Sequence, residues 1–171
     1  MKEKAKEFKK ELKQKGYDLK DFSIRTRYNE MIVKIKNYKV NKSEIEKIAF
    51  KYERVDYDEK LGEILAGGND FVWVEYDVDF SQIYEDYKDK ALELIEKLNE
   101  EIATRRNWAI EINKKYYLNK LNDFEYRVLI LNNEGQYERE NVTFYANSKN
   151  LLALCKVLCA IELFDNMKHF N

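Results

Sequence analysis

The clearest chemical pattern in the sequence is a row of alternating carboxylates. Glu75, Asp77 and Asp79 alternate with apolar residues in the run 71–80, which is typical of a β-strand. On an extended strand the three carboxylates point to one face, with about 6–7 Å between neighbours. Phosphates along a nucleic-acid strand have comparable spacing. Such a row could therefore occupy a basic cleft that normally holds DNA or RNA.

Residues that follow this row could extend it into a partner-binding surface. Glu85 and Asp86 continue the negative charge. Tyr84 and Tyr87 could anchor a partner, because charged contacts alone set the association rate more than the affinity. Core packing is the alternative role for both tyrosines. An ordinary solvated acidic face, partly neutralised by the basic N-terminal third, is the alternative for the whole set.

Carboxylates are also hard oxygen ligands that suit Mg²⁺ or Mn²⁺, as in metal-dependent nucleases. The candidate ligands are Asp56, Asp58, Glu75, Asp77 and Asp79. No basic or nucleophile-positioning residue accompanies them in the sequence, so an exposed acidic strand is the simpler interpretation. A metal-dependent nuclease remains an alternative function.

Other catalytic signatures are weak. His169 is the single histidine and lies near the end of the sequence, which disfavours a catalytic triad. Cys155 and Cys159 share one face of an apolar helix, where we expect buried thiols rather than a zinc site. The pair Gly67 and Gly68 lacks the lysine and the spacing of a phosphate-binding loop. We therefore expect a protein that is not an enzyme and uses no metal or cofactor.

Basic side chains near the N-terminus support a different function. They alternate with β-formers in two runs, 22–28 and 31–38, which predict a hairpin. Their charges could contact phosphates while neighbouring tyrosines stack on bases. The nucleic-acid-binding alternative therefore rests on Arg25, Arg27, Lys34 and Lys36.

Composition and charge limit the protein class. The chain has 171 residues, of which 44% are hydrophobic and 37% charged, so it can form one domain or two small ones. The formal net charge of −1 hides an asymmetry: +8 over residues 1–51, −11 over 52–103 and +2 over 104–171. The longest apolar run, 151–164, is too short for a membrane span and contains two charges. We expect a cytoplasmic protein with no membrane contact.

Periodicity predicts an α+β fold with antiparallel strands, in two hairpins plus a central strand, packed with a long helix and a buried C-terminal helix. We expect a small α+β domain over 1–80 and a helical extension with a hairpin over 81–171. A capping box at Ser43 and Glu46 predicts the start of the second helix. For 104–121 we favour a second or kinked helix, although Trp108, Ile110 and Ile112 also alternate as in a strand. The other expected elements are helices over 2–15, 81–103 and 148–167, and strands over 71–80, 125–131 and 140–146.

The first 80 residues resemble the large polyvalent protein-associated small α+β domains of phages, plasmids and conjugative elements. The resemblance is carried by the runs KKELKQKG, FSIRTRY, IVKIK, SEIEKIAFKYE and DEKLGEILAGGNDFVWVEYD. It implies a mobile-element protein produced against a host, because such domains often accompany anti-restriction and entry-phase functions. It implies no catalytic residues.

Together, the resemblance and the excess of acidic residues over 52–103 predict an inhibitor of a host defence nuclease, of the anti-CRISPR or anti-restriction type. Its partner would be that nuclease or its nucleic-acid-binding subunit, held through a surface that mimics DNA. A homodimer formed through the long helix is a further alternative.

Overall fold

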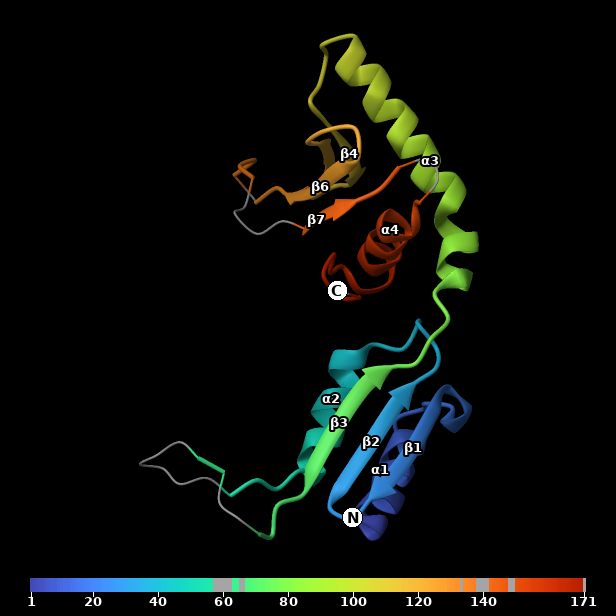
Figure 1. Cartoon of the computed structure of the whole chain (residues 1–171), viewed down its shortest axis with the longest axis vertical. Coiled ribbons are helices and arrows are strands. Elements are labelled where there is room, and N and C mark those ends of the chain that lie inside the picture. The colour runs from blue at the N-terminus through green and yellow to red at the C-terminus, as the bar shows by residue number, and fades with distance from the viewer. Residues whose placement is uncertain (57–62, 65–66, 133, 138–141, 148–149, 171) are drawn as a thin grey trace. The chain divides into compact units, whose positions relative to one another are not determined.

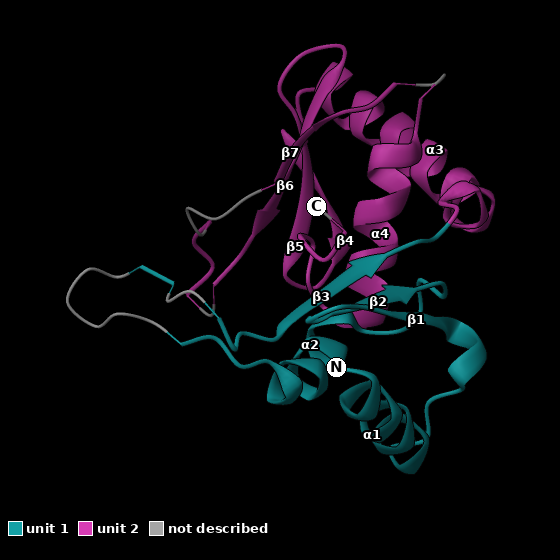
Figure 2. Cartoon of the chain, turned by 60° about the horizontal axis from the view of Figure 1, so that its bottom comes forward, with its two compact units in different colours: residues 1–78 teal, residues 79–171 magenta. Residues whose placement is uncertain are grey.

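The computed structural model describes the whole chain except residues 57–62, 65–66, 133, 138–141, 148–149 and 171. Its architecture is α+β, as predicted, with two separate sheets (Figure 1). The chain divides into two compact units, Met1–Val78 and Asp79–Asn171 (Figure 2). The unit boundary lies close to the division that we expected after residue 80.

Unit 1 has a three-stranded sheet in the order β1-β2-β3. β1 and β2 form the predicted antiparallel hairpin, whereas β3 pairs with β2 in parallel. The parallel pair differs from the antiparallel strands predicted. The pair is parallel because α2 lies between β2 and β3 and returns the chain to the end of the sheet at which β2 begins. The elements are α1 (Lys2–Gln14), β1 (Phe22–Arg27), β2 (Glu30–Ile35), α2 (Lys42–Ala49) and β3 (Phe71–Tyr76), with short 3-10 turns at Leu19–Asp21 and Phe50–Tyr52.

Local sequence explains where the two helices of unit 1 begin and end. α1 stops before Gly16, whose φ of +86° suits the predicted position just beyond a helix. α2 begins two residues earlier than the Ser43 capping box predicted. Asn41 is its N-cap and accepts a hydrogen bond from the Ser43 backbone N–H at 3.0 Å. Both residue types cap helices well.

Both helices of unit 1 cover the same face of its sheet. Figure 1 shows α1 and α2 behind the three strands, and Figure 2 shows both helices on one side of them. Within the described ranges, no helix of unit 1 covers the other face. The core between helices and sheet consists mainly of Ala5, Phe8, Leu12, Phe22, Met31, Val33, Ile35, Ile45, Ile48, Ala49, Val72 and Val74.

Unit 2 contains a four-stranded antiparallel sheet in the order β4-β5-β6-β7. The long helix α3 and the final helix α4 pack against each other. α4 is buried on most sides, as predicted, and both cysteines lie in it as buried thiols. Burial raises the pKa of Cys155 to about 11. The elements are α3 (Ser81–Ala103), β4 (Ala109–Asn113), β5 (Tyr116–Lys120), β6 (Glu125–Ile130), β7 (Val142–Tyr145) and α4 (Leu152–Phe164).

The helix that we favoured over 104–121 is wrong, because this segment forms the β4–β5 hairpin. α3 ends at Ala103, and Arg105 has a φ of +54°, which a continuing helix cannot contain. Ile110 packs into the core opposite Leu118, so the alternating pattern describes this segment better than the helical one.

None of the helices in the described ranges is long and apolar enough to cross a membrane.

The core behind the first sheet can be tested at Leu12, which is fully buried in α1. We expect Leu12→Ala to lower the free energy of unfolding of unit 1 by about 2–5 kcal/mol, because it leaves a cavity. Lys13→Ala, at an exposed position of the same helix, should change it by less than about 0.5 kcal/mol. Urea denaturation followed by Trp73 fluorescence in a Trp108→Phe background measures both. Equal effects would contradict the packing described.

Candidate functional site

The three carboxylates of the predicted acidic row, Glu75, Asp77 and Asp79, form ion pairs or hydrogen bonds with other residues of the same chain. Lys34 lies between two of its members, with its Nζ 3.4 Å from Glu75 Oε1 and 3.7 Å from Asp77 Oδ2. Asp79 accepts a hydrogen bond from the Ser81 backbone N–H at 2.9 Å, at the start of α3. This bond lowers the pKa of Asp79. The row is therefore partly neutralised and does not form a bare line of negative charge.

The other residues predicted for the acidic surface all lie on α3. Tyr87 is buried, which is the core-packing role that we kept as its alternative, and burial raises its pKa. Tyr84 is half-buried. Glu85 pairs with Lys88, and Asp86 accepts a hydrogen bond from Gln82. Both carboxylates therefore have partners within α3 itself.

The carboxylates proposed as metal ligands do not form a metal site in the described residues. No three His, Cys, Asp or Glu side chains in the described ranges gather closely enough to hold an ion. Asp56 pairs with Arg54 instead. Asp58 lies outside the described residues. The nuclease alternative therefore gains no support from this geometry.

The predicted basic residues occupy the face of the first sheet that its helices leave uncovered. Arg25 and Arg27 point to this face from β1 and are both exposed. None of the described residues forms an ion pair with either of them. Lys34 points to the same face from β2, but its ammonium group forms ion pairs with Glu75 and Asp77. Lys36 is exposed just beyond the end of β2.

Two aromatic residues of β3 join this basic face, and sequence analysis did not connect them with it. The strand register aligns Arg25 with Ile32 and Trp73 in one row, and Arg27 with Glu30 and Phe71 in the next. Trp73 is 56% exposed, which is unusual for so large an apolar residue on a strand. The usable signal was its spacing of two and four residues from Glu75 and Asp77, which puts Trp73 on the polar face of the strand. We call Arg25, Arg27, Ile32, Phe71 and Trp73 the open sheet face.

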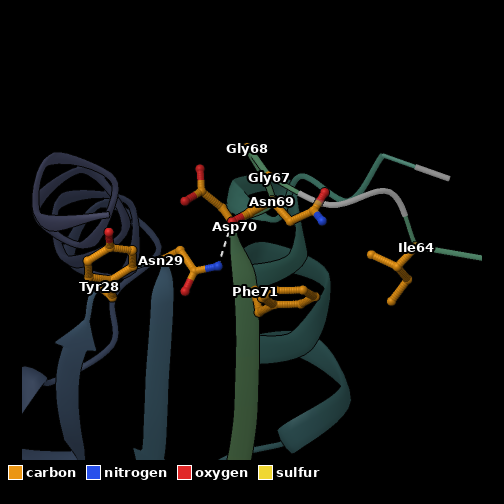
Figure 3. A pocket seen from close by; sticks show the side chains of 8 residues that line it. All are labelled: Tyr28, Asn29, Ile64, Gly67, Gly68, Asn69, Asp70 and Phe71. Carbon is orange, nitrogen blue, oxygen red and sulfur yellow. Dashed lines mark hydrogen bonds between the residues drawn. The ribbon is translucent and has the colours of Figure 1, made fainter.

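A pocket lies at the end of this face, between the β1–β2 turn and the segment that leads into β3 (Figure 3). Asn29 donates a hydrogen bond from Nδ2 to the Asn69 carbonyl at 2.8 Å, and its own carbonyl accepts one from the Phe71 backbone at 2.9 Å. In Figure 3 the rings of Tyr28 and Phe71 lie on either side of Asn29. Asn29 therefore joins the β1–β2 turn, which carries the fully exposed Tyr28, to the start of β3.

An ion pair ties α1 to the beginning of β3 beside this pocket. Lys4 Nζ lies 2.7 Å from Asp70 Oδ2 and also donates to the Tyr52 carbonyl at 2.9 Å. The hydrogen bond from Lys4 lowers the pKa of Asp70. Asp70 is thus held as a carboxylate in a structural role and is unsuited to act as a general acid.

Comparisons with known proteins give no relatives: no family model, no curated protein and no solved structure matches the chain. Functional assignment therefore depends on the geometry described above.

The Lys4–Asp70 pair predicts a stability difference that depends on pH. A lowered pKa in the folded state stabilises the fold above the ordinary carboxyl pKa of 3.8, and this contribution is lost as the pH falls through the lowered value. We expect Asp70→Asn to lower the free energy of unfolding by about 0.5–1 kcal/mol at pH 7.

Thermal unfolding of both proteins from pH 7 to pH 2 measures this difference, which should disappear at the acidic end. Glu7→Gln removes an exposed carboxylate of α1 and should leave the stability unchanged at either pH. A constant difference between Asp70→Asn and the parent protein across the range would contradict a role for the carboxylate charge.

Proposed function

We propose that this chain is a non-catalytic nucleic-acid-binding protein and that the open sheet face is its contact surface. One observation carries the proposal: the two exposed arginines of β1 and the exposed Trp73 of β3 lie on the same uncovered face. This function was the alternative that the basic hairpin predicted. The additional support is the aromatic strand beside it.

These residue types suit a nucleic acid for separate reasons. An arginine side chain is always charged, and its planar guanidinium forms paired hydrogen bonds with phosphate oxygens. An exposed indole offers a flat surface on which a base stacks. Because Glu30 and Glu75 also point to this side of the sheet, the net positive charge is small. Stacking must therefore supply much of the affinity.

The fold suits such a surface because it holds these side chains on a rigid support. β2 is hydrogen-bonded to a strand on each side, and the reverse face of the sheet is packed against α1 and α2. Little backbone order has to be gained on binding, so the cost in conformational entropy is small. Residues on a packed sheet keep their spacing better than residues on a loop.

Substitution of both arginines tests this function. We expect Arg25→Gln with Arg27→Gln to weaken binding by roughly tenfold at low salt. The slope of log K against log salt should become shallower by about one for each phosphate that the variant no longer neutralises. Fluorescence anisotropy with labelled mixed-sequence strands and duplexes measures both effects. Arg105→Gln with Arg106→Gln removes two exposed arginines from unit 2 and serves as the matched control.

Binding that is absent for every nucleic acid at micromolar protein and low salt would remove this function. An equal weakening by the control variant of Arg105 and Arg106 would show attraction by overall charge rather than by the open sheet face.

A second candidate is the inhibitor of a host defence nuclease that the sequence predicted, and α3 provides the observation that favours it. Four exposed carboxylates follow one another at helical spacing along this helix, so they share one stripe. The stripe is about 16 Å long at 1.5 Å per residue. In the described part of the chain none of the four forms an ion pair. The stripe consists of Asp89, Glu93, Glu96 and Glu100.

In this second function the acidic stripe on α3 would be the contact surface, in place of the predicted row of Glu75, Asp77 and Asp79. It would contact the positive cleft of a CRISPR effector or a restriction enzyme in the cytoplasm and compete there with DNA. The resemblance of the first 80 residues to domains of mobile elements supports a protein made against such a host defence. Both the target and the mobile-element origin belong to this proposal.

Two triple variants of equal charge change test the second function. Asp89→Asn, Glu93→Gln and Glu96→Gln should relieve inhibition of DNA cleavage by about tenfold or more if the acidic stripe makes the contact. The matched control is Glu111→Gln with Asp123→Asn and Glu134→Gln, which lie elsewhere in unit 2. Equal relief by both variants, or no inhibition of any nuclease by the parent protein, would contradict this role.

A further inference from the structure

We infer that the open sheet face takes single-stranded nucleic acid and reads it as two successive nucleotides. Phe71 and Trp73 stack on the two bases, while Arg25 and Arg27 contact the phosphates. This inference rests on the proposed nucleic-acid-binding function and specifies its ligand. It follows from the positions of the four side chains relative to one another.

The four residues form two parallel tracks across the sheet. Arg25 lies in register with Trp73, and Arg27 with Phe71, each pair separated by one residue of β2. Neighbouring strands lie about 4.8 Å apart, so the two tracks are about 10 Å apart. Within each track the two side chains are two residues apart on one strand, which corresponds to about 6.6 Å.

This arrangement matches an extended nucleotide strand laid along the sheet. Successive nucleotides of such a strand have a spacing comparable with that between alternate residues of a β-strand. Each base is displaced sideways from its phosphate, as the aromatic track is displaced from the arginine track. Proteins that bind single strands combine these two elements, a basic track for the backbone and aromatic rings for the bases.

A duplex fits the same surface poorly. Its bases are already paired and stacked on each other, so their flat faces are not accessible to Phe71 or Trp73. Reading base edges in a groove needs a protruding helix or ribbon, whereas this surface is the face of a sheet. Phosphate contacts would have to hold the duplex alone, and Glu30 and Glu75 reduce the positive charge available for them.

A second copy of the chain is a less suitable occupant. A two-fold contact brings the same patch of both copies together, which would set the arginine track against arginines or against the aromatic track. Facing arginines repel each other, and an aromatic ring offers a guanidinium group only a weak cation–π contact. Phosphates satisfy both guanidinium groups directly.

The test uses the Trp108→Phe protein, in which Trp73 is the single tryptophan. Ten-nucleotide oligo(dT) and oligo(rU) are titrated separately, and a blunt-ended duplex of ten base pairs is the comparison. We expect the single strands to quench Trp73 fluorescence and to bind at least tenfold more tightly than the duplex. The more tightly bound of the two oligomers identifies the natural strand as DNA or RNA.

Variants of Trp73 separate stacking from simple charge attraction, with anisotropy as the readout. We expect Trp73→Thr, which keeps a strand-forming residue, to weaken single-strand binding about tenfold, and Trp73→Phe to restore most of it. Trp108→Thr alters a tryptophan of similar exposure in unit 2 and should have no effect. Two phosphate contacts predict a slope of about −1.4 for log K against log salt.

The outcomes distinguish this inference from the function on which it rests. Equal affinity for duplex and single strand, lowered by the arginine variants, would overturn the single-strand inference and leave the proposed function in place. Binding of neither would overturn both. A dimer in light scattering that Trp73→Thr converts to a monomer would assign the face to a second copy, and would also overturn the inference. Circular dichroism of each variant confirms that the fold persists.

Discussion

β2 lies in the centre of the first sheet, and its hydrogen bonds to the strands on either side determine which residues share a face. Its antiparallel pairing with β1 and parallel pairing with β3 put Arg25, Ile32 and Trp73 in one row. A shift of one residue in the pairing with β3 would turn Phe71 and Trp73 toward the helices, and a shift in the pairing with β1 would turn the two arginines there. The burial of Phe22 on β1 and of Val72 and Val74 on β3 in the core beneath the helices prevents these shifts.

Charge along the sequence describes the surface of this protein poorly. The middle third has a large excess of carboxylates, yet Lys34 of the basic N-terminal third lies between Glu75 and Asp77. Opposite charges that are distant in sequence meet whenever neighbouring strands carry them in register, and β2 and β3 do so here. Acidic residues on α3 are different, because their neighbours in a helix are also their neighbours in sequence.

The helix-or-strand ambiguity of the segment after α3 shows a second limit of sequence patterns. Residues Trp108, Ile112 and Tyr116 fit a helix, and Trp108, Ile110 and Ile112 fit a strand, so spacing alone does not decide. The left-handed backbone at Arg105 ends the helix, and pairing with β5 then stabilises the strand. β5 is itself held by β6, so the choice depends on contacts outside the segment.

Sequence alone determined the features that depend on near neighbours: the amphipathic α1 with Gly16 after it, the β1–β2 hairpin, the long α3, the buried cysteines of α4 and the α+β class. Each follows from periodicity or from a residue at a helix end, because these act over a few residues. Only the tertiary structure decided that β3 pairs in parallel with β2, that Lys34 pairs with two carboxylates, and that Trp73 shares a face with two arginines. Those three facts arise from strand pairing across the crossover through α2, and the free energy of that pairing comes from burying a core to which all the elements of unit 1 contribute.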